Sequence, residues 1–190
     1  KLFTMIARDW ISLVGIIVGI FAFSSGLWQY MKAQKWKRAE FVANSINEFD
    51  SQEEIQNAKL MLDWNSRVIV LHCIGFPDGL EFEFDDDLLC KALKPHTEIS
   101  GFSDNEVAVR DTFDRFFDDL EKFDHFIESG LVNAIEFKPY LRYWLNLIGN
   151  ENSGRKRPIV IKAIWKYIDY YGYTGVQKLF CRYGYDIHPN

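Results

Sequence analysis

A long apolar segment interrupts the pattern of hydrophobic and polar positions near the start of the chain. Between Asp9 and Lys32 no residue carries a charge, and residues 10–31 have the sequence WISLVGIIVGIFAFSSGLWQYM. A helix of this length extends over about 33 Å, and the hydrocarbon core of a bilayer is about 30 Å thick. The pattern therefore predicts one N-terminal transmembrane helix over residues 10–31, preceded by a short flank over residues 1–9.

Two other interpretations compete with a membrane span. A secretory signal peptide has an apolar region of about 7–15 residues before a small-residue cleavage site, and Ser24–Gly26 resembles such a site. The segment here is longer and leads into basic residues, and a helix that is apolar on all sides is rarely the core helix of a small domain. Trp10 at one end and Trp28 and Tyr30 at the other fit the aromatic belts of the two membrane interfaces, which favours a transmembrane helix.

Charges on either side of the segment predict its orientation. The N-terminal flank contains Lys1, Arg8 and Asp9. The C-terminal flank has a denser group of basic residues, namely Lys32, Lys35, Lys37 and Arg38. Because positive residues are retained on the cytoplasmic side, we expect the C-terminal domain in the cytosol and the helix in the inner (cytoplasmic) membrane. The four basic residues are then membrane-interface residues, with membrane lipid as a partner.

Small residues recur along one side of the predicted transmembrane helix. They alternate at spacings of three and four, and we call them the small-residue stripe: Ser12, Gly15, Gly19, Ala22 and Gly26. Helices associate in lipid through close packing, which the GxxxG pair Gly15 and Gly19 allows, and a period of 3.5 is that of a left-handed helix seam. Glycine and alanine are common in membrane helices, but one continuous register predicts a homo-oligomer. A dimer, a larger ring and contact with a different membrane protein stay open.

Helical spacing continues beyond the membrane segment in a juxtamembrane helical region, residues 32–64. Residues 33–49 contain no Gly or Pro and have apolar residues at helical spacing. We predict a break at Asp50–Ser51, where Ser51 and Glu54 form the capping-box pattern of the next helix. A continuous helix of this kind joins the membrane segment to the domain that follows.

Residues 65–190 are predicted to form a cytosolic, mostly helical domain with a small β-hairpin near residues 67–84. Arg67–Ile74 is rich in Val and Ile, Phe76–Gly79 is a turn signal, and Leu80–Phe84 alternates apolar and acidic residues. Helix signals follow at 88–93, at 103–129 with a Ser103 and Glu106 capping box, at 139–148, at 158–172 and at 175–183. The predicted fold class is mainly α: one N-terminal transmembrane helix followed by a helical cytosolic domain with a small β-hairpin.

Composition and motifs offer little catalytic chemistry. A net charge of −5 gives no dominant basic face, and nucleic-acid binding, which the sequence disfavours, has only the loop Gly154–Arg157 as a candidate. Near a membrane, the three positive charges of this loop fit anionic lipid headgroups equally well. The acidic residues 81–87 lack EF-hand spacing, and we interpret both this run and the loop as solvated surface. The His and Cys residues are too scattered for zinc, and Cys73, Cys90 and Cys181 suit a reducing compartment. We expect no metal and no cofactor.

Several segments of the soluble domain resemble a group of bacterial hypothetical proteins that carry one N-terminal membrane helix. These segments are NAKLMLDW (57–64), RDTFDRFFDDLEKFDHFIESGLV (110–132), PYLRYWL (139–145) and YYGYTGVQKLFCRYGYDI (170–187). The resemblance implies the same architecture and, because no activity is established for that group, implies no site. A membrane helix with a small helical domain also resembles the membrane accessory protein of type VI-B CRISPR systems, which implies an oligomeric pore, a HEPN-like motif and a role in antiviral defence.

HEPN ribonucleases use an Arg and a His that are closely spaced on a helix. Arg182 and His188 have such a spacing, as do Arg67 and His72, but the second pair falls on a predicted strand. Composition alone produces pairs of this kind, so an ordinary pair at a helix end is the simpler interpretation. Arg182 and His188 are the candidate catalytic residues.

The sequence favours a non-enzymatic, single-pass membrane protein that self-assembles through the small-residue stripe. We expect it to act as an oligomeric membrane effector or pore, or as a scaffold for a protein partner at the membrane. A membrane-tethered HEPN-like ribonuclease is one alternative. A subunit of a larger hetero-oligomeric membrane complex is another.

Overall fold

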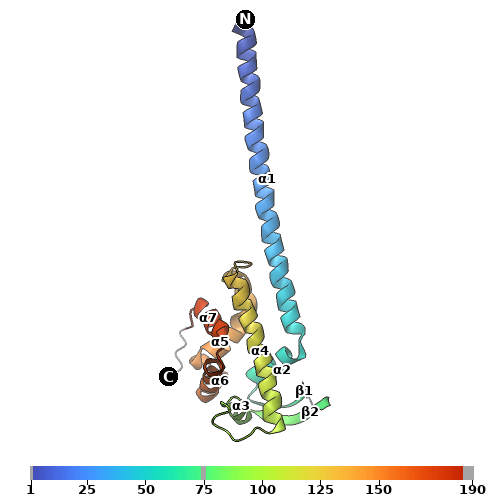
Figure 1. Ribbon diagram of the computed structural model, residues 1–190, viewed down its shortest axis with the longest axis vertical. Helices are drawn as coiled ribbons and strands as arrows, with labels where there is room; N and C mark the ends of the chain where they lie inside the picture. The colour runs from blue at the N-terminus through green and yellow to red at the C-terminus, as the bar shows by residue number, and fades with distance from the viewer. Residues whose placement is uncertain (1, 74–75, 186–190) are drawn as a thin grey trace. The chain divides into compact units, whose positions relative to one another are not determined.

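The computed structural model describes residues 2–73 and 76–185, with backbone alone at residues 2–9, 11–12, 73, 77 and 152. Over these residues the chain is mainly α-helical with one antiparallel hairpin, as the sequence predicts (Figure 1). Its contacts divide it into two compact units, Lys1–Phe41 and Val42–Asn190, which are described separately below.

Helix α1 (Leu2–Ser51) contains the whole segment predicted to cross a membrane. It ends where expected, at Ser51, but the predicted capping box of Ser51 and Glu54 is wrong. The Ser51 hydroxyl donates to the Glu48 carbonyl at 2.8 Å, and α2 (Glu53–Asp63) starts after Gln52, whose side chain makes no capping bond. Ser51 is the last residue of α1, so Gln52 and not Ser51 takes the position before the first residue of α2.

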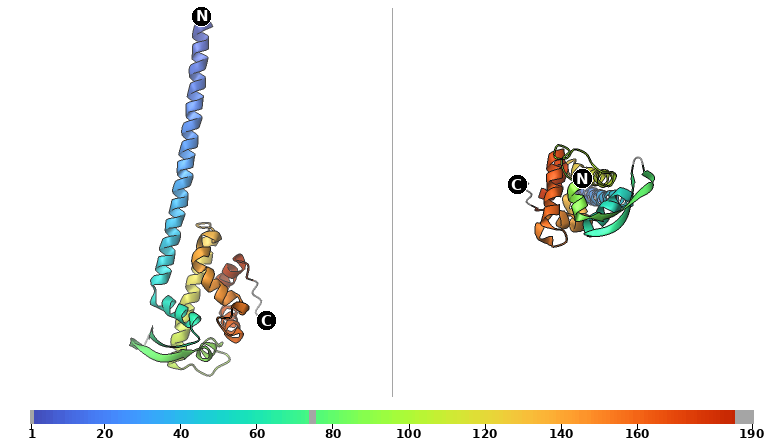
Figure 2. Two further views of the ribbon diagram at one scale, coloured as in Figure 1. Left: turned by 180° about the vertical axis from the view of Figure 1, so that it is seen from behind. Right: turned by 90° about the horizontal axis from the view of Figure 1, so that it is seen from below.

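Helix α4 (Asp104–Glu128) is the central element of the second unit, with α2, α3 and α7 packed against it (Figure 2). The predicted Ser103 and Glu106 capping box is confirmed, and Gly130 follows the helix at a φ of +75°, which favours glycine. The Phe49 ring, at the end of α1, lies 5.2 Å from the ring of Phe123 on α4. These rings belong to an aromatic core that includes Phe113, Phe116, Phe117 and Phe137.

The hairpin consists of β1 (Ser66–Cys73) and β2 (Phe76–Asp85), paired with Ile69 opposite Phe82. Its existence is confirmed, but the predicted turn at Phe76–Gly79 is wrong. Those residues lie inside β2, where the register shifts and Gly79 has a φ of +87°, so the glycine serves a bulge instead of the reversal. Ile69, Leu71 and Phe84 are buried, whereas Val68 and Val70 on the other face are exposed.

The other helices lie close to their predicted positions. They are α3 (Asp86–Ala92), α5 (Ala134–Gly149), α6 (Pro158–Tyr171) and α7 (Thr174–Arg182), with a 3₁₀ turn η1 (Glu151–Ser153). The largest difference is α5, which extends five residues before Pro139, the first residue of the segment in which the sequence indicated a helix. The Glu136 carboxylate accepts a hydrogen bond from the Asn133 amide at 2.7 Å and so stabilises the earlier start.

Candidate functional site

The surface of α1 is the first candidate site, because its apolar side chains are not covered within their own unit. Large residues such as Ile16, Val18, Ile20 and Phe21 are each at least 60% exposed. Among the described residues, one helix is long and apolar enough to cross a membrane, and no residue of its most apolar stretch is buried. The structure thus confirms a helix of membrane-spanning length and composition.

The small-residue stripe lies on this exposed helix. A Cβ atom added to Gly15, Gly19 or Gly26 would meet no atom of another part of the described chain within 4 Å. Ala22 is exposed, and the side chain of Ser12 lies outside the described side chains. This side of the helix is therefore accessible to a close neighbour.

Aromatic and basic side chains gather at the C-terminal end of the apolar segment. Trp28 and Tyr30 are more than half exposed, as is Trp10 at the other end. The Nζ atom of Lys32 lies 5.3 Å from the centroid of the Trp28 ring, in a cation–π contact. The remaining predicted interface residues, Lys35, Lys37 and Arg38, are exposed.

The candidate catalytic residue Arg182 is held in an ion pair. Its Nε donates to Asp124 Oδ1 on α4 at 2.6 Å, and the Asp124 side chain is only 1% exposed. His188 lies outside the described residues. The contact gives Arg182 a structural role in fastening α7 to α4.

The other Arg and His pair is not brought together. His72 Nδ1 lies 2.5 Å from Glu53 Oε1 on α2. The Arg67 guanidinium lies over the Trp64 ring, 5.7 Å from its centroid. Because each residue has a different neighbour, the two do not form a shared site.

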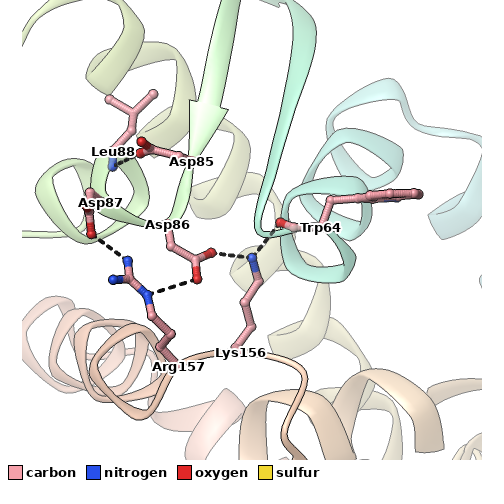
Figure 3. Close-up of polar contacts among 7 residues, drawn as sticks. All are labelled: Trp64, Asp85, Asp86, Asp87, Leu88, Lys156 and Arg157. Carbon is pink, nitrogen blue, oxygen red and sulfur yellow. Dashed lines mark hydrogen bonds and ion pairs between the residues drawn. The ribbon is translucent and has the colours of Figure 1, made fainter.

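Buried charges join two runs of opposite sign that are far apart in the sequence (Figure 3). Lys156 Nζ, which precedes α6, donates to Asp86 Oδ1 at 2.6 Å and to the Trp64 carbonyl at 2.7 Å. Arg157 donates to Asp86 Oδ2 at 3.4 Å and to Asp87 Oδ1 at 2.5 Å. The expectation of solvated surface is wrong for Lys156 and Asp86, because each neutralises the other inside the fold.

Burial and pairing shift the ionisation of this charge cluster. Burial lowers the pKa of the Lys156 ammonium, against the opposing effect of the Asp86 carboxylate. The Arg157 guanidinium holds the pKa of Asp87 below its usual value. A cavity of about 180 Å³ beside the cluster is lined by Asn65, Asp85, Asp86, Asp87 and Arg157. Asp85 accepts a hydrogen bond from the Leu88 amide at 2.7 Å. Because these carboxylates already have partners, we interpret the cluster as a structural one that holds α2, α3 and α6 together.

A second polar cluster fastens α4 to α6 and α7. The hydroxyls of Tyr167 and Tyr173 both donate to Asp114 Oδ1, at 2.5 and 2.8 Å. Burial and this carboxylate raise the pKa of both phenols, which stay protonated as donors. Asp111 and Asp118 share this face of α4, and burial together with the Asp114 charge raises the pKa of both carboxyls.

Metal-binding side chains are not gathered at one place in the part of the chain that the structure describes. Within it, no group of three or more His, Cys, Asp or Glu side chains is placed to hold a metal ion. Cys90 on α3 is half-buried, and burial raises the pKa of its thiol, which lowers its thiolate fraction. The exposed surface of α1 therefore remains the strongest candidate site.

Comparisons of the chain with protein-family models, curated proteins and solved structures find no match. The resemblances to the bacterial group and to the CRISPR accessory protein stay predictions. Any function must consequently be argued from the geometry of this chain.

Proposed function

We propose that this is a single-pass membrane protein, anchored by α1, that self-assembles through the small-residue stripe. The observation that carries the proposal is the exposure of large apolar side chains on the described part of α1, including Ile17, Phe21 and Phe23. Leaving one such side chain in water forgoes about 1.5–3 kcal/mol relative to burial. A lipid environment removes this cost along the whole segment.

Aromatic residues at both ends support a transmembrane position. Trp10 and Trp28 are separated by about 27 Å along a helix, close to the ~30 Å thickness of the hydrocarbon core. The basic residues that follow Trp28 favour a cytosolic location for the C-terminal domain and an inner-membrane location for the helix.

The small-residue stripe supports the proposal that the membrane helix mediates self-assembly as well as anchoring. Its glycines leave the helix backbone open to close approach, which is the contact that drives association in lipid. Association of α1 would gather several cytosolic domains at one place on the membrane. The protein would then act as a scaffold for a protein partner.

A pore is the other effector that such an oligomer could form. Apart from the aromatic residues at its ends, the segment 10–31 contains few polar side chains, namely Ser12, Ser24, Ser25 and Gln29. An aqueous channel needs a polar lining, and this sequence supplies little, so we favour the scaffold. Ion flux through vesicles that contain the purified protein separates the two.

Membrane anchoring is tested by flotation of bacterial membranes after alkaline extraction. We expect the unaltered chain to float with lipid. Ile17→Arg with Phe21→Arg places two charges near the middle of the span, at about 2.5–3.5 kcal/mol each, and should shift the protein to the soluble or aggregated fraction. The matched variant Ile17→Leu with Phe21→Leu should float. Recovery of the unaltered chain in the soluble fraction would contradict the proposal.

The two alternatives make different predictions. A HEPN-like ribonuclease should cleave RNA and lose that activity when His188 is replaced by Ala. A subunit of a hetero-oligomeric complex should be monomeric when it is expressed alone.

A further inference from the structure

The two sides of α1 differ in chemistry. Trp28 follows Gly19 by about two and a half turns at 3.6 residues per turn, so it lies opposite the small-residue stripe. Trp10 and Trp28 are about five full turns apart and share one side. Large exposed residues fall on that side between them: Leu13, Ile17 and Phe21. We call this the aromatic side of α1.

The basic residues after Trp28 divide between these two sides. Lys32 and Lys35 follow Trp28 by about one and two turns and continue the aromatic side. Lys37 follows Gly19 by about five full turns and therefore lies on the side of the stripe. Arg38 flanks the aromatic side. All four are exposed, so neither side is closed by a partner within the first unit.

We propose that Trp28, Lys32 and Lys35 form a binding surface for the headgroups of anionic phospholipids. The proposal rests on the proposed function, because it requires α1 to cross a bilayer. An indole at the end of a membrane span lies at the headgroup level, and the contact of 5.3 Å between Lys32 Nζ and the Trp28 ring holds the ammonium at that level. Lys35, one turn further along, faces the same headgroup layer.

Position along the chain favours lipid over an acidic protein as the partner. Lys32 directly follows the uncharged segment, so its ammonium lies within reach of lipid phosphates. If copies of the chain pack through the stripe, the aromatic side stays turned toward lipid. Lys37 would then lie near the contact between helices and would add little to lipid selectivity.

Lipid selectivity is measured by native mass spectrometry of the full chain in detergent. The probes are phosphatidylglycerol and phosphatidylcholine with identical acyl chains. We expect the unaltered chain to bind phosphatidylglycerol preferentially. One basic residue near a membrane surface contributes about a fivefold preference, so Lys35→Gln should reduce the selectivity about fivefold. Lys32→Gln with Lys35→Gln should nearly abolish it.

Lys37→Gln is the matched control, because it removes the same charge two positions away on the other side of the helix. It should change the selectivity less than about twofold. Equal binding of the two lipids by the unaltered chain, or an equal loss in Lys35→Gln and Lys37→Gln, would overturn the inference. Flotation of the same variants keeps the two proposals apart: chains that float without lipid selectivity refute this inference alone, and chains that do not float refute the membrane anchor.

Discussion

Lys156 Nζ and Asp86 Oδ1 lie 2.6 Å apart, and neither side chain is more than 5% exposed. Asp86 is the first residue of α3, and Lys156 lies two residues before the start of α6. The Lys156 ammonium also donates to the carbonyl of Trp64, the residue that follows α2. Three chain segments are thereby held at one point. Within the basic loop Lys156 is thus part of the fold, whereas Arg155 and Arg157 stay about half exposed.

Replacing Lys156 with Met should destabilise the second unit strongly. It leaves the Asp86 carboxylate buried with only the more distant Arg157 as a cationic partner, and breaking a buried pair costs about 3–5 kcal/mol. Urea unfolding of the full chain in mild detergent measures the change. Lys166→Met is the control, because the Lys166 and Glu98 pair is exposed and should contribute less than about 1 kcal/mol. Equal losses of unfolding free energy in the two variants would show that the buried pair stabilises the fold no more than an exposed pair does.

Arg182 should behave as a structural residue. Arg182→Gln removes the cation beside the buried Asp124, and we expect a loss of about 2–3 kcal/mol, reduced by the partial exposure of Arg182. The same unfolding measurement applies. Lys178→Gln on the same helix removes a cation from an exposed pair with Glu128 and should have little effect. RNA cleavage by the unaltered chain, lost in a stably folded Arg182 variant, would instead support a ribonuclease.

The carboxyl of Asp118 should give a stability contribution that falls with rising pH. Burial and Asp114 raise its pKa above 3.8, so the folded state holds this proton more tightly than the unfolded state. The contribution is complete below pH 3.8 and is lost as the pH rises through the raised pKa. Asp118→Asn should therefore be more stable than the unaltered chain at about pH 7 and gain less at about pH 3.

Asp87 serves as a control, because its pKa is shifted in the opposite direction. Arg157 lowers its pKa, so its contribution is present above pH 3.8 and is lost as the pH falls through the lowered value. Asp87→Asn should consequently be less stable than the unaltered chain at about pH 7. Free energies of unfolding at the two pH values check both variants. The same sign of change in both variants at neutral pH would contradict these assignments.

Local sequence signals predicted the elements well and their ends less well. Residues 33–49 form the continuous helix expected from the lack of Gly and Pro. The Phe76–Gly79 signal predicted a turn, but a glycine with positive φ such as Gly79 serves a bulge as readily as a reversal. The signal at 139–148 covered only part of α5, which starts at Ala134 and contains Pro139 in its interior.

The charge cluster was missed because its partners are distant in the sequence. Asp86 and Lys156 are brought together by tertiary packing, which periodicity and capping rules do not report. One signal was available: the acidic run Asp85–Asp87 and the basic run Arg155–Arg157 have complementary charges. The two sides of α1, in contrast, were predictable, because helical spacing alone decides which residues of a continuous helix share a side.

Adding bulk to the small-residue stripe should prevent the self-assembly proposed above. Gly15→Leu with Gly19→Leu places side chains where a neighbouring helix would approach, and we expect a particle of smaller mass in detergent. The control Leu13→Phe with Ile17→Phe adds bulk on the aromatic side of α1 and should leave the mass unchanged. Loss of assembly in the control alone would place the contact on the aromatic side.

The mass of the purified, unaltered particle tests the central claim, an anchored chain that assembles with itself. Light scattering in a mild detergent, corrected for bound detergent, gives the protein mass directly. One chain has a mass of 22.3 kDa. The account predicts a defined multiple of this value for the chain expressed alone. A protein mass of a single chain, under conditions in which the domain is folded, would contradict it.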